Sequence, residues 1–242
     1  MFNRIVIKQG NKSEGEMPFW ISFADLMTAC MTLFLVVMAV TILSLQKKYD
    51  SQITEEKERK DSIEYCAEEL KTVAETKFPN AKIQYNKGDS IRIDLGSVVN
   101  FESGKYEISS KGRYFLRGYI PTVLSAVKSK QCHAYFRRVV VEGYTDIDGS
   151  YMTNLLLSLQ RSREVVCALS KKEDIDNTLT ETELKEIRDH FLVGGFSFNS
   201  LKKEKSESRR VELKLEFWQL HEKDQIENTQ NTDLDNKEFG KC

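Results

Sequence analysis

The chain has 242 residues, of which 36 are basic and 37 acidic, so its formal net charge is −1 at pH 7. This balance creates no basic field, and nucleic acid is therefore not an expected partner. Apolar residues make up 40% of the chain, enough for an apolar segment and one domain with its own core. The sequence has no metal-ligand spacing of Cys and His, no nucleophile triad and no phosphate-binding loop, so we expect neither a cofactor nor an enzyme.

Residues 18–45 form an almost unbroken apolar run with one ionisable residue, Asp25. As a helix rising about 1.5 Å per residue, the run is long enough to cross a hydrocarbon core of about 30 Å. It exceeds the apolar region of a signal peptide, which is about 7 to 15 residues long, so we expect an uncleaved transmembrane helix. Residues 1–17 form a short polar tail before it.

Asp25 is unusual because a carboxylate at the centre of a spanning helix costs about 2.5 to 3.5 kcal/mol on insertion scales. Either it reaches the headgroups or a basic partner, or it binds and releases a proton, since desolvation lets a carboxyl group be neutral near neutral pH. We favour the proton-carrier interpretation. Small or polar residues share the helix face of Asp25, namely Ser22, Ala29, Thr32, Val36 and Ala39.

Basic residues flank the apolar run unequally, with fewer before it than after it. The positive-inside rule by itself therefore argues mildly against a cytoplasmic N-terminus. The basic residues before the run are Arg4, Lys8 and Lys12, and those closely after it are Lys47, Lys48, Lys57, Arg59 and Lys60.

Residues 46–80 are rich in Glu, Lys and Gln, and apolar side chains recur in them at helical spacing, at Ile63, Cys66, Leu70 and Val73. This pattern predicts a helical linker with a thin apolar stripe. The stripe could pair with a second copy of the chain, or the helix could be a solvated stalk.

Residues 81–220 are expected to form an α+β domain, an α/β sandwich with helices packed on a small sheet. Residues 221–242 have few large apolar side chains and are expected to be disordered. The expected strands cover residues 91–95, 138–142, 191–195 and 211–217, and the expected helices cover residues 111–128, 151–171 and 181–190.

In the expected helix over residues 151–171, a stripe that includes Leu155 and Leu159 should pack on the sheet. The face that carries Asn154, Ser158 and Arg161 should then display polar groups.

Cysteine usage leaves two alternatives. In an oxidising compartment Cys132 and Cys167 could form a disulfide, or both could remain buried or free thiols.

Residues at fixed offsets follow the expected strand over 138–142, namely Gly143, Thr145, Asp146, Gly149, Asn154, Leu157, Ser158 and Arg161. With the segment SRRVEL at residues 208–213, this pattern resembles the signature of OmpA-like peptidoglycan-binding domains. The resemblance covers about residues 81–218. Two positions depart from the family pattern, Ser162 in place of a small Ala and Ser208 in place of Asn.

The resemblance implies that Asp146 and Arg161 bind the diaminopimelate of the peptidoglycan stem peptide, with Thr145 and Asn154 beside them. The chemistry is suitable, because a carboxylate binds an ammonium group and a guanidinium binds a carboxylate through two hydrogen bonds. The alternative is a plain surface salt bridge between Asp146 and Arg161.

The segment FWISFADLMT together with the peptidoglycan-binding pattern resembles the B subunits of ion-driven stators such as MotB, and is most similar to the ZorB subunits of Zorya anti-phage systems. This resemblance implies a homodimer, a multi-spanning A subunit (MotA/ZorA-like) and peptidoglycan as partners, with Asp25 as the proton carrier. It also implies a bacterial inner-membrane location, with a cytoplasmic N-terminus and a periplasmic linker and domain. The alternatives are a flagellar-type stator subunit and a membrane-anchored wall tether without ion transport.

Overall fold

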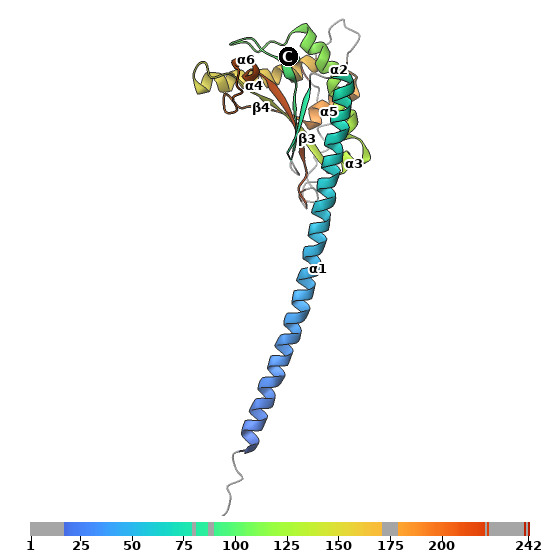
Figure 1. The fold of residues 1–242 in the computed structure, drawn as a ribbon, viewed down its shortest axis with the longest axis vertical. Helices are drawn as coiled ribbons and strands as arrows, with labels where there is room; N and C mark the ends of the chain where they lie inside the picture. Colours follow the sequence, from blue (N-terminus) through green and yellow to red (C-terminus); the bar gives the residue numbers. More distant parts are fainter. Residues whose placement is uncertain are drawn as a thin grey trace, which may run out of the picture. The chain divides into compact units, whose positions relative to one another are not determined.

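The computed structural model describes residues 17–78, 81–86, 90–170, 179–220, 222, 240 and 242 (Figure 1). The chain divides into two compact units, Met1–Thr54 and Glu55–Cys242. Helix α1 (Met17–Lys77) contributes residues to both. Most of the two expected tails, residues 1–16 and 223–239, lies outside the described residues.

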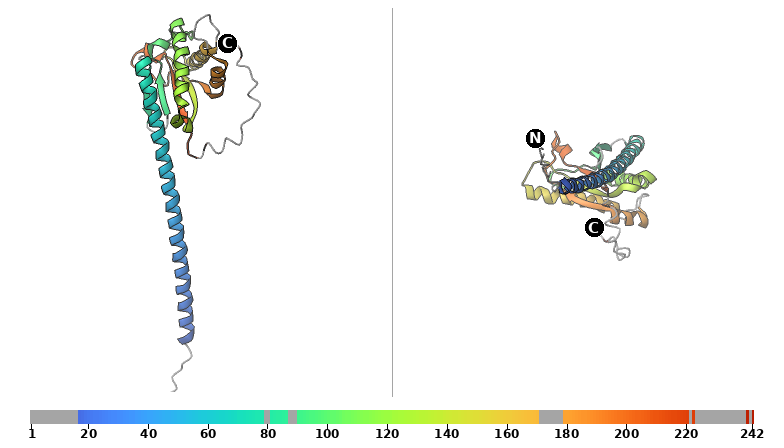
Figure 2. Two further views of the ribbon diagram at one scale, coloured as in Figure 1. Left: turned by 90° about the vertical axis from the view of Figure 1, so that its right-hand side faces the viewer. Right: turned by 90° about the horizontal axis from the view of Figure 1, so that it is seen from below.

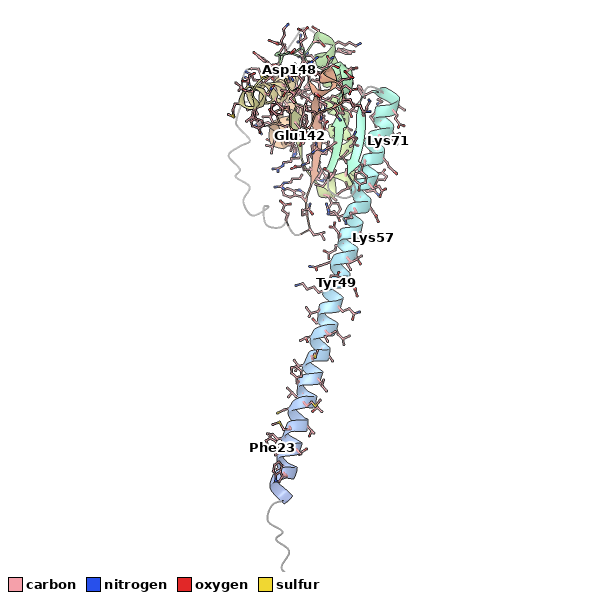
Figure 3. All side chains as sticks on the ribbon, turned by 60° about the vertical axis from the view of Figure 1, so that its left-hand side comes forward. Phe23, Tyr49, Lys57, Lys71, Glu142 and Asp148 are labelled. Atoms are coloured by element: carbon pink, nitrogen blue, oxygen red, sulfur yellow. A yellow bond between two sulfur atoms is a disulfide. The ribbon has the colours of Figure 1, made fainter. Side chains whose placement is uncertain are left out.

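In the first unit, α1 contains a segment that is long and apolar enough, by length and composition, to cross a membrane. Its large side chains are exposed, and Figure 3 shows Phe23 and Tyr49 projecting away from the helix. The hydroxyl groups of Thr28, Thr32 and Thr41 donate hydrogen bonds to backbone carbonyls three residues earlier in the helix. These bonds satisfy polar groups that would otherwise be costly in an apolar environment.

In the second unit, the end of α1 is part of the domain core. Ile63, Cys66 and Leu70, on the predicted apolar stripe, are fully buried. Figure 2 shows this end of α1 beside the neighbouring helix α2 (Ser110–Val127). The stripe therefore packs on the chain's own domain, an outcome that differs from both roles considered for it.

The second unit contains one five-stranded sheet in the order β1-β2-β5-β3-β4. The pairs β1·β2, β2·β5 and β5·β3 are antiparallel, whereas β3·β4 is parallel. The strands are β1 (Lys82–Asn86), β2 (Ser90–Asp94), β3 (Phe136–Gly143), β4 (Phe191–Gly195) and β5 (Val211–Phe217).

The helices in the second unit follow the predicted pattern with additions, and the α+β class is confirmed. The N-cap of α2 is Ser109, whose side chain accepts a hydrogen bond from the amide of Gly112. Short elements and β1 were not predicted. The remaining elements are η1 (Gly96–Val99), α3 (Lys130–Tyr135), α4 (Tyr151–Ser170), α5 (Glu181–His190) and α6 (Lys205–Ser208).

The two faces of the sheet differ in polarity. Strand register aligns Ile93, Leu213 and Val141 on one face, where all three are fully buried. The other face aligns Glu212 with Glu142, which is labelled in Figure 3. Arg92 of β2 forms ion pairs with both carboxylates and so neutralises part of their charge. Paired charges on this face make burial of the carboxylates tolerable.

Two disulfides join distant parts of the second unit. Cys66 of α1 bonds to Cys132 of α3 with a Cα–Cα distance of 5.3 Å, and Cys167 of α4 bonds to Cys242 at 5.7 Å. Both alternatives considered for Cys132 and Cys167 are therefore wrong. The partners lie 66 and 75 residues away along the chain, so only the fold brings them within bonding reach.

We predict that the double variant Cys66→Ala/Cys132→Ala lowers the free energy of unfolding by about 2 to 4 kcal/mol, because the bond closes a long loop in the unfolded chain. Thermal unfolding of the purified full-length chain in detergent measures this change. Cys30→Ala is the matched control, since Cys30 is an exposed free thiol. An unchanged melting temperature in the double variant would contradict the prediction.

Candidate ligand-binding site

Helix α4 lies unusually close to the ends of β3 and β4, because two glycines face it. A Cβ atom on Gly143 would stand 2.0 Å from the carbonyl oxygen of Ser158, and one on Gly195 would stand 2.8 Å from the Ser158 Oγ. Such distances are too short for any larger residue. The Ser158 Oγ also accepts a hydrogen bond from the amide of Ser197 at 3.0 Å. These contacts explain why the sequence pattern that follows the strand over residues 138–142 includes both Gly143 and Ser158.

The turn after β3 carries Asp146 and is shaped by Asn154. The Asn154 Nδ2 donates to the carbonyl of Asp148 at 2.9 Å, and Gly149 adopts the left-handed φ of +99° that the turn requires. The amide of Asp148 donates to Asp146 Oδ1 at 3.3 Å. Figure 3 labels Asp148 at this end of the domain. Asn154 therefore organises the turn from within the protein.

Thr145 is buried at the start of this turn. Its amide donates to the carbonyl of Ser197 at 2.9 Å. Its Oγ1 is buried and has no hydrogen-bond partner among the described residues. An orphaned hydroxyl of this kind is costly and is suited to a ligand group or a water.

Arg161 is fully buried, contrary to the expected polar surface of α4. Its guanidinium donates to three backbone carbonyls, those of Lys105 at 3.0 Å, Tyr144 at 2.9 Å and Glu102 at 3.1 Å. It also lies over the ring of Phe101, 4.9 Å from the centroid. Burial lowers the pKa of Arg161 to about 10, and the nearby Asp146 partly opposes that shift. The polar face of α4 is buried because carbonyl groups in the loop after Phe101 accept hydrogen bonds from Arg161.

Asp146 pairs with Arg209 and not with Arg161. The Arg209 Nη1 donates to Asp146 Oδ2 at 2.9 Å, and its Nε donates to the carbonyl of Phe101 at 2.9 Å. Among the described residues, no hydrogen bond or ion pair joins Asp146 to Arg161, so the plain salt bridge considered from the sequence is wrong. Sequence reasoning missed Arg209, although the Arg-Arg pair in SRRVEL was a usable signal.

Both departures from the family pattern have structural roles. Ser162 Oγ donates to the carbonyls of Gly194 at 2.7 Å and Ser158 at 3.1 Å, which ties α4 to β4. Ser208 Oγ accepts from the amide of Lys202 at 2.9 Å and donates to the carbonyl of Glu204. These serines therefore fit the fold without disturbing Asp146 or Arg209.

Asp25 belongs to the first unit and is not part of this site. It lies on α1, where its backbone carbonyl accepts the Thr28 hydroxyl at 2.9 Å. In the described ranges no group of three or more His, Cys, Asp or Glu residues is placed to hold a metal ion.

Comparison with known proteins gives the chain a family. No protein-family model matches it. The Zorya protein ZorB of Escherichia coli O139:H28 is 38% identical over 222 residues, which cover 91% of this chain and 89% of that protein. The chain belongs to the ZorB family. A second ZorB, from Escherichia coli strain ATCC 8739, is 24% identical over 88% of this chain and 94% of its own length.

Solved structures similar to this ZorB-family chain are more distant. A putative MotB-like protein from Desulfovibrio vulgaris is 15% identical, with a TM-score of 0.47, over 67% of this chain and 99% of that one. The periplasmic domain of Helicobacter pylori MotB is 12% identical, with a TM-score of 0.41, over 66% and 93% of the two chains. The family assignment rests on the 38% identity to the ZorB of Escherichia coli O139:H28.

We predict that Gly143→Ala destabilises this ZorB-family chain by at least about 1 to 3 kcal/mol, because the added methyl group meets the α4 backbone and overpacks the contact. Thermal unfolding measures the change. Gly118→Ala in α2 is the control, since a Cβ there meets only the Phe78 ring at an ordinary 3.8 Å. Equal melting temperatures for the two variants would show that α4 adjusts without cost.

Proposed function

We propose that this chain is the B subunit of a proton-driven, stator-type membrane motor that is anchored to the cell wall and serves anti-phage defence. The observation that carries the proposal is the 38% identity to a Zorya ZorB over nearly the whole chain. The organisation of the chain supports it, because an apolar segment of membrane length with a single acid, Asp25, precedes a domain with a charged candidate site.

The candidate site supports wall binding through Asp146, Arg161, Thr145 and Asn154. Asp146 offers a carboxylate at the end of β3, and two guanidinium groups lie close to it, so the cluster can bind a zwitterionic group of the stem peptide. The buried and unpartnered Thr145 hydroxyl is a further group that a ligand can satisfy. Asn154 acts through the turn that presents Asp146.

In the proposed motor, Asp25 carries the proton. A carboxyl group at an interface with a partner helix is neutral when it is dry and charged when it is wetted, so each proton passage changes the energy of that contact. An anchored B subunit is held still, and the partner must therefore move. Because one helix cannot enclose an ion path, the proposal requires a multi-spanning A subunit (MotA/ZorA-like) and a second copy of the B subunit.

The location that we propose is the bacterial inner membrane, with the N-terminus in the cytoplasm and the second unit in the periplasm. The positive-inside rule argued against this orientation. The two disulfides support it, because disulfides persist in oxidising compartments such as the periplasm and are rare in the cytosol.

We predict that Asp25→Asn abolishes protection against phage while the protein still reaches the membrane and assembles, since the amide cannot carry a proton. A phage-challenge assay measures protection, and blotting of membrane fractions measures assembly. Asp50→Asn is the matched control, because Asp50 lies on the same helix beyond the apolar run. Full protection by the Asp25 variant would contradict the role of Asp25 as proton carrier. It would favour a membrane-anchored wall tether without ion transport.

We also predict that affinity purification of the full-length chain from its native membranes recovers a multi-spanning partner and a second, differently tagged copy of the chain. Mass spectrometry identifies the partner, and the second tag reports the homodimer. Recovery of the chain by itself would argue against a stator and for a simple wall tether. A flagellar-type subunit would instead bring flagellar motor proteins.

A further inference from the structure

We propose that the Cys66–Cys132 disulfide transmits pulling force from α1 into β3, and through β3 to the turn that carries Asp146. The bond bypasses the edge strand β1, into which the main chain leads after α1. This inference rests on the proposed function, in which the wall holds the second unit while α1 works in the membrane. It gives the disulfide a mechanical task in addition to its effect on stability.

Force between the membrane and the wall has to cross from α1 into the sheet. Helix α1 contains the apolar segment of membrane length, and the second unit begins within α1 at Glu55. The candidate wall site at Asp146 lies after the end of β3. Two covalent routes lead from α1 toward the sheet, the main chain after Lys77 and the disulfide at Cys66.

The main-chain route enters the sheet at its edge. After α1 the chain continues into β1, which pairs with β2 and is the first strand in the sheet order. A short strand that is paired on one side has little support, since a two-stranded hairpin is marginally stable by itself. Under tension β1 is therefore the weak point of this route.

The disulfide route enters at the interior of the sheet. Cys132 lies in α3, and β3 begins at Phe136, directly after that helix (Figure 1). Strand β3 is paired on both sides, with β5 and with β4. It ends at Gly143, three residues before Asp146. Force that enters at Cys132 therefore reaches the candidate site along one strand that has neighbours on both sides.

The non-covalent contacts of α1 resist tension less well than a covalent bond. The buried stripe includes small side chains such as Ala67, which bury little apolar surface. Beside the disulfide, Ser129 Oγ donates to Glu69 Oε2 at 3.1 Å. Arg59 Nη1 donates to the carbonyl of Trp218 at a longer 3.5 Å. Contacts of this kind can open locally without unfolding the domain, whereas the disulfide keeps α1 attached.

The second disulfide provides a matched control. Cys167 and Cys242 are 75 residues apart, against 66 for Cys66 and Cys132, so loss of either bond should lower the melting temperature by a similar amount. The control bond joins α4 to a residue that follows β5. Neither route from α1 to Asp146 passes through it.

The experiment compares the variant Cys66→Ala/Cys132→Ala with Cys167→Ala/Cys242→Ala, both in the full-length chain in its native cells. A phage-challenge assay measures protection, which requires force transmission. Co-sedimentation of the purified chain with cell-wall sacculi measures binding without tension, and thermal unfolding measures stability. We expect the first variant to lose protection and to bind sacculi as the unaltered chain does. The second variant should keep both properties despite a similar fall in melting temperature.

The outcomes separate this inference from the proposed function. If the unaltered chain fails to protect or to bind sacculi, the proposed function fails and the inference fails with it. If the unaltered chain does both and Cys66→Ala/Cys132→Ala protects fully, the proposed function stands and the force route is overturned. Loss of protection in both variants, or loss of sacculi binding in the first, would show that the bond acts through stability and would also overturn the force route.

Discussion

The close approach of α4 to the ends of β3 and β4 is the contact on which the rest of the second unit depends. It exists because Gly143 and Gly195 carry no side chain, so the α4 backbone around Ser158 lies directly on them. Once α4 is placed there, Arg161 reaches the loop after Phe101 and Asn154 reaches the turn after β3. Two missing side chains thus determine where the charged groups of the site stand.

Compensation of buried charge is a second constraint on the same region. Arg210 pairs with Glu212 at 2.6 Å and lies over the Tyr144 ring, 4.2 Å from its centroid. The Tyr144 hydroxyl donates to Glu142 at 2.8 Å, and burial together with that carboxylate raises the pKa of the phenol. An isolated buried ion costs several kcal/mol, so each of these groups depends on its partner.

Local patterns in the sequence predicted the elements whose cause is local. Alternation identified β2 and β5, and helical spacing identified α2, α4 and α5. The features that the sequence could not predict depend on residues far away along the chain. The polar face of α4 is buried because carbonyls more than 50 residues earlier in the chain accept from Arg161. The stripe on α1 and both disulfides likewise depend on contacts that only the completed fold creates.

In the candidate site, too, local sequence predicted some features and only the fold revealed the others. The positions of Asp146, Asn154 and Arg161 followed from the pattern, but the partner of each did not. Asp146 binds Arg209, which follows α6 and precedes β5, 63 residues further on, and no spacing rule connects the two residues. Its identification required the antiparallel pairing that brings β5 beside β3.

The three carbonyl bonds of Arg161 also bear on how such sequence patterns are interpreted. Because this side chain holds a loop in place, natural selection would retain it for folding alone. A relative that had lost all affinity for the cell wall would still carry the arginine, and its sequence would still match. A match to the pattern at Arg161 therefore does not by itself indicate affinity for the cell wall.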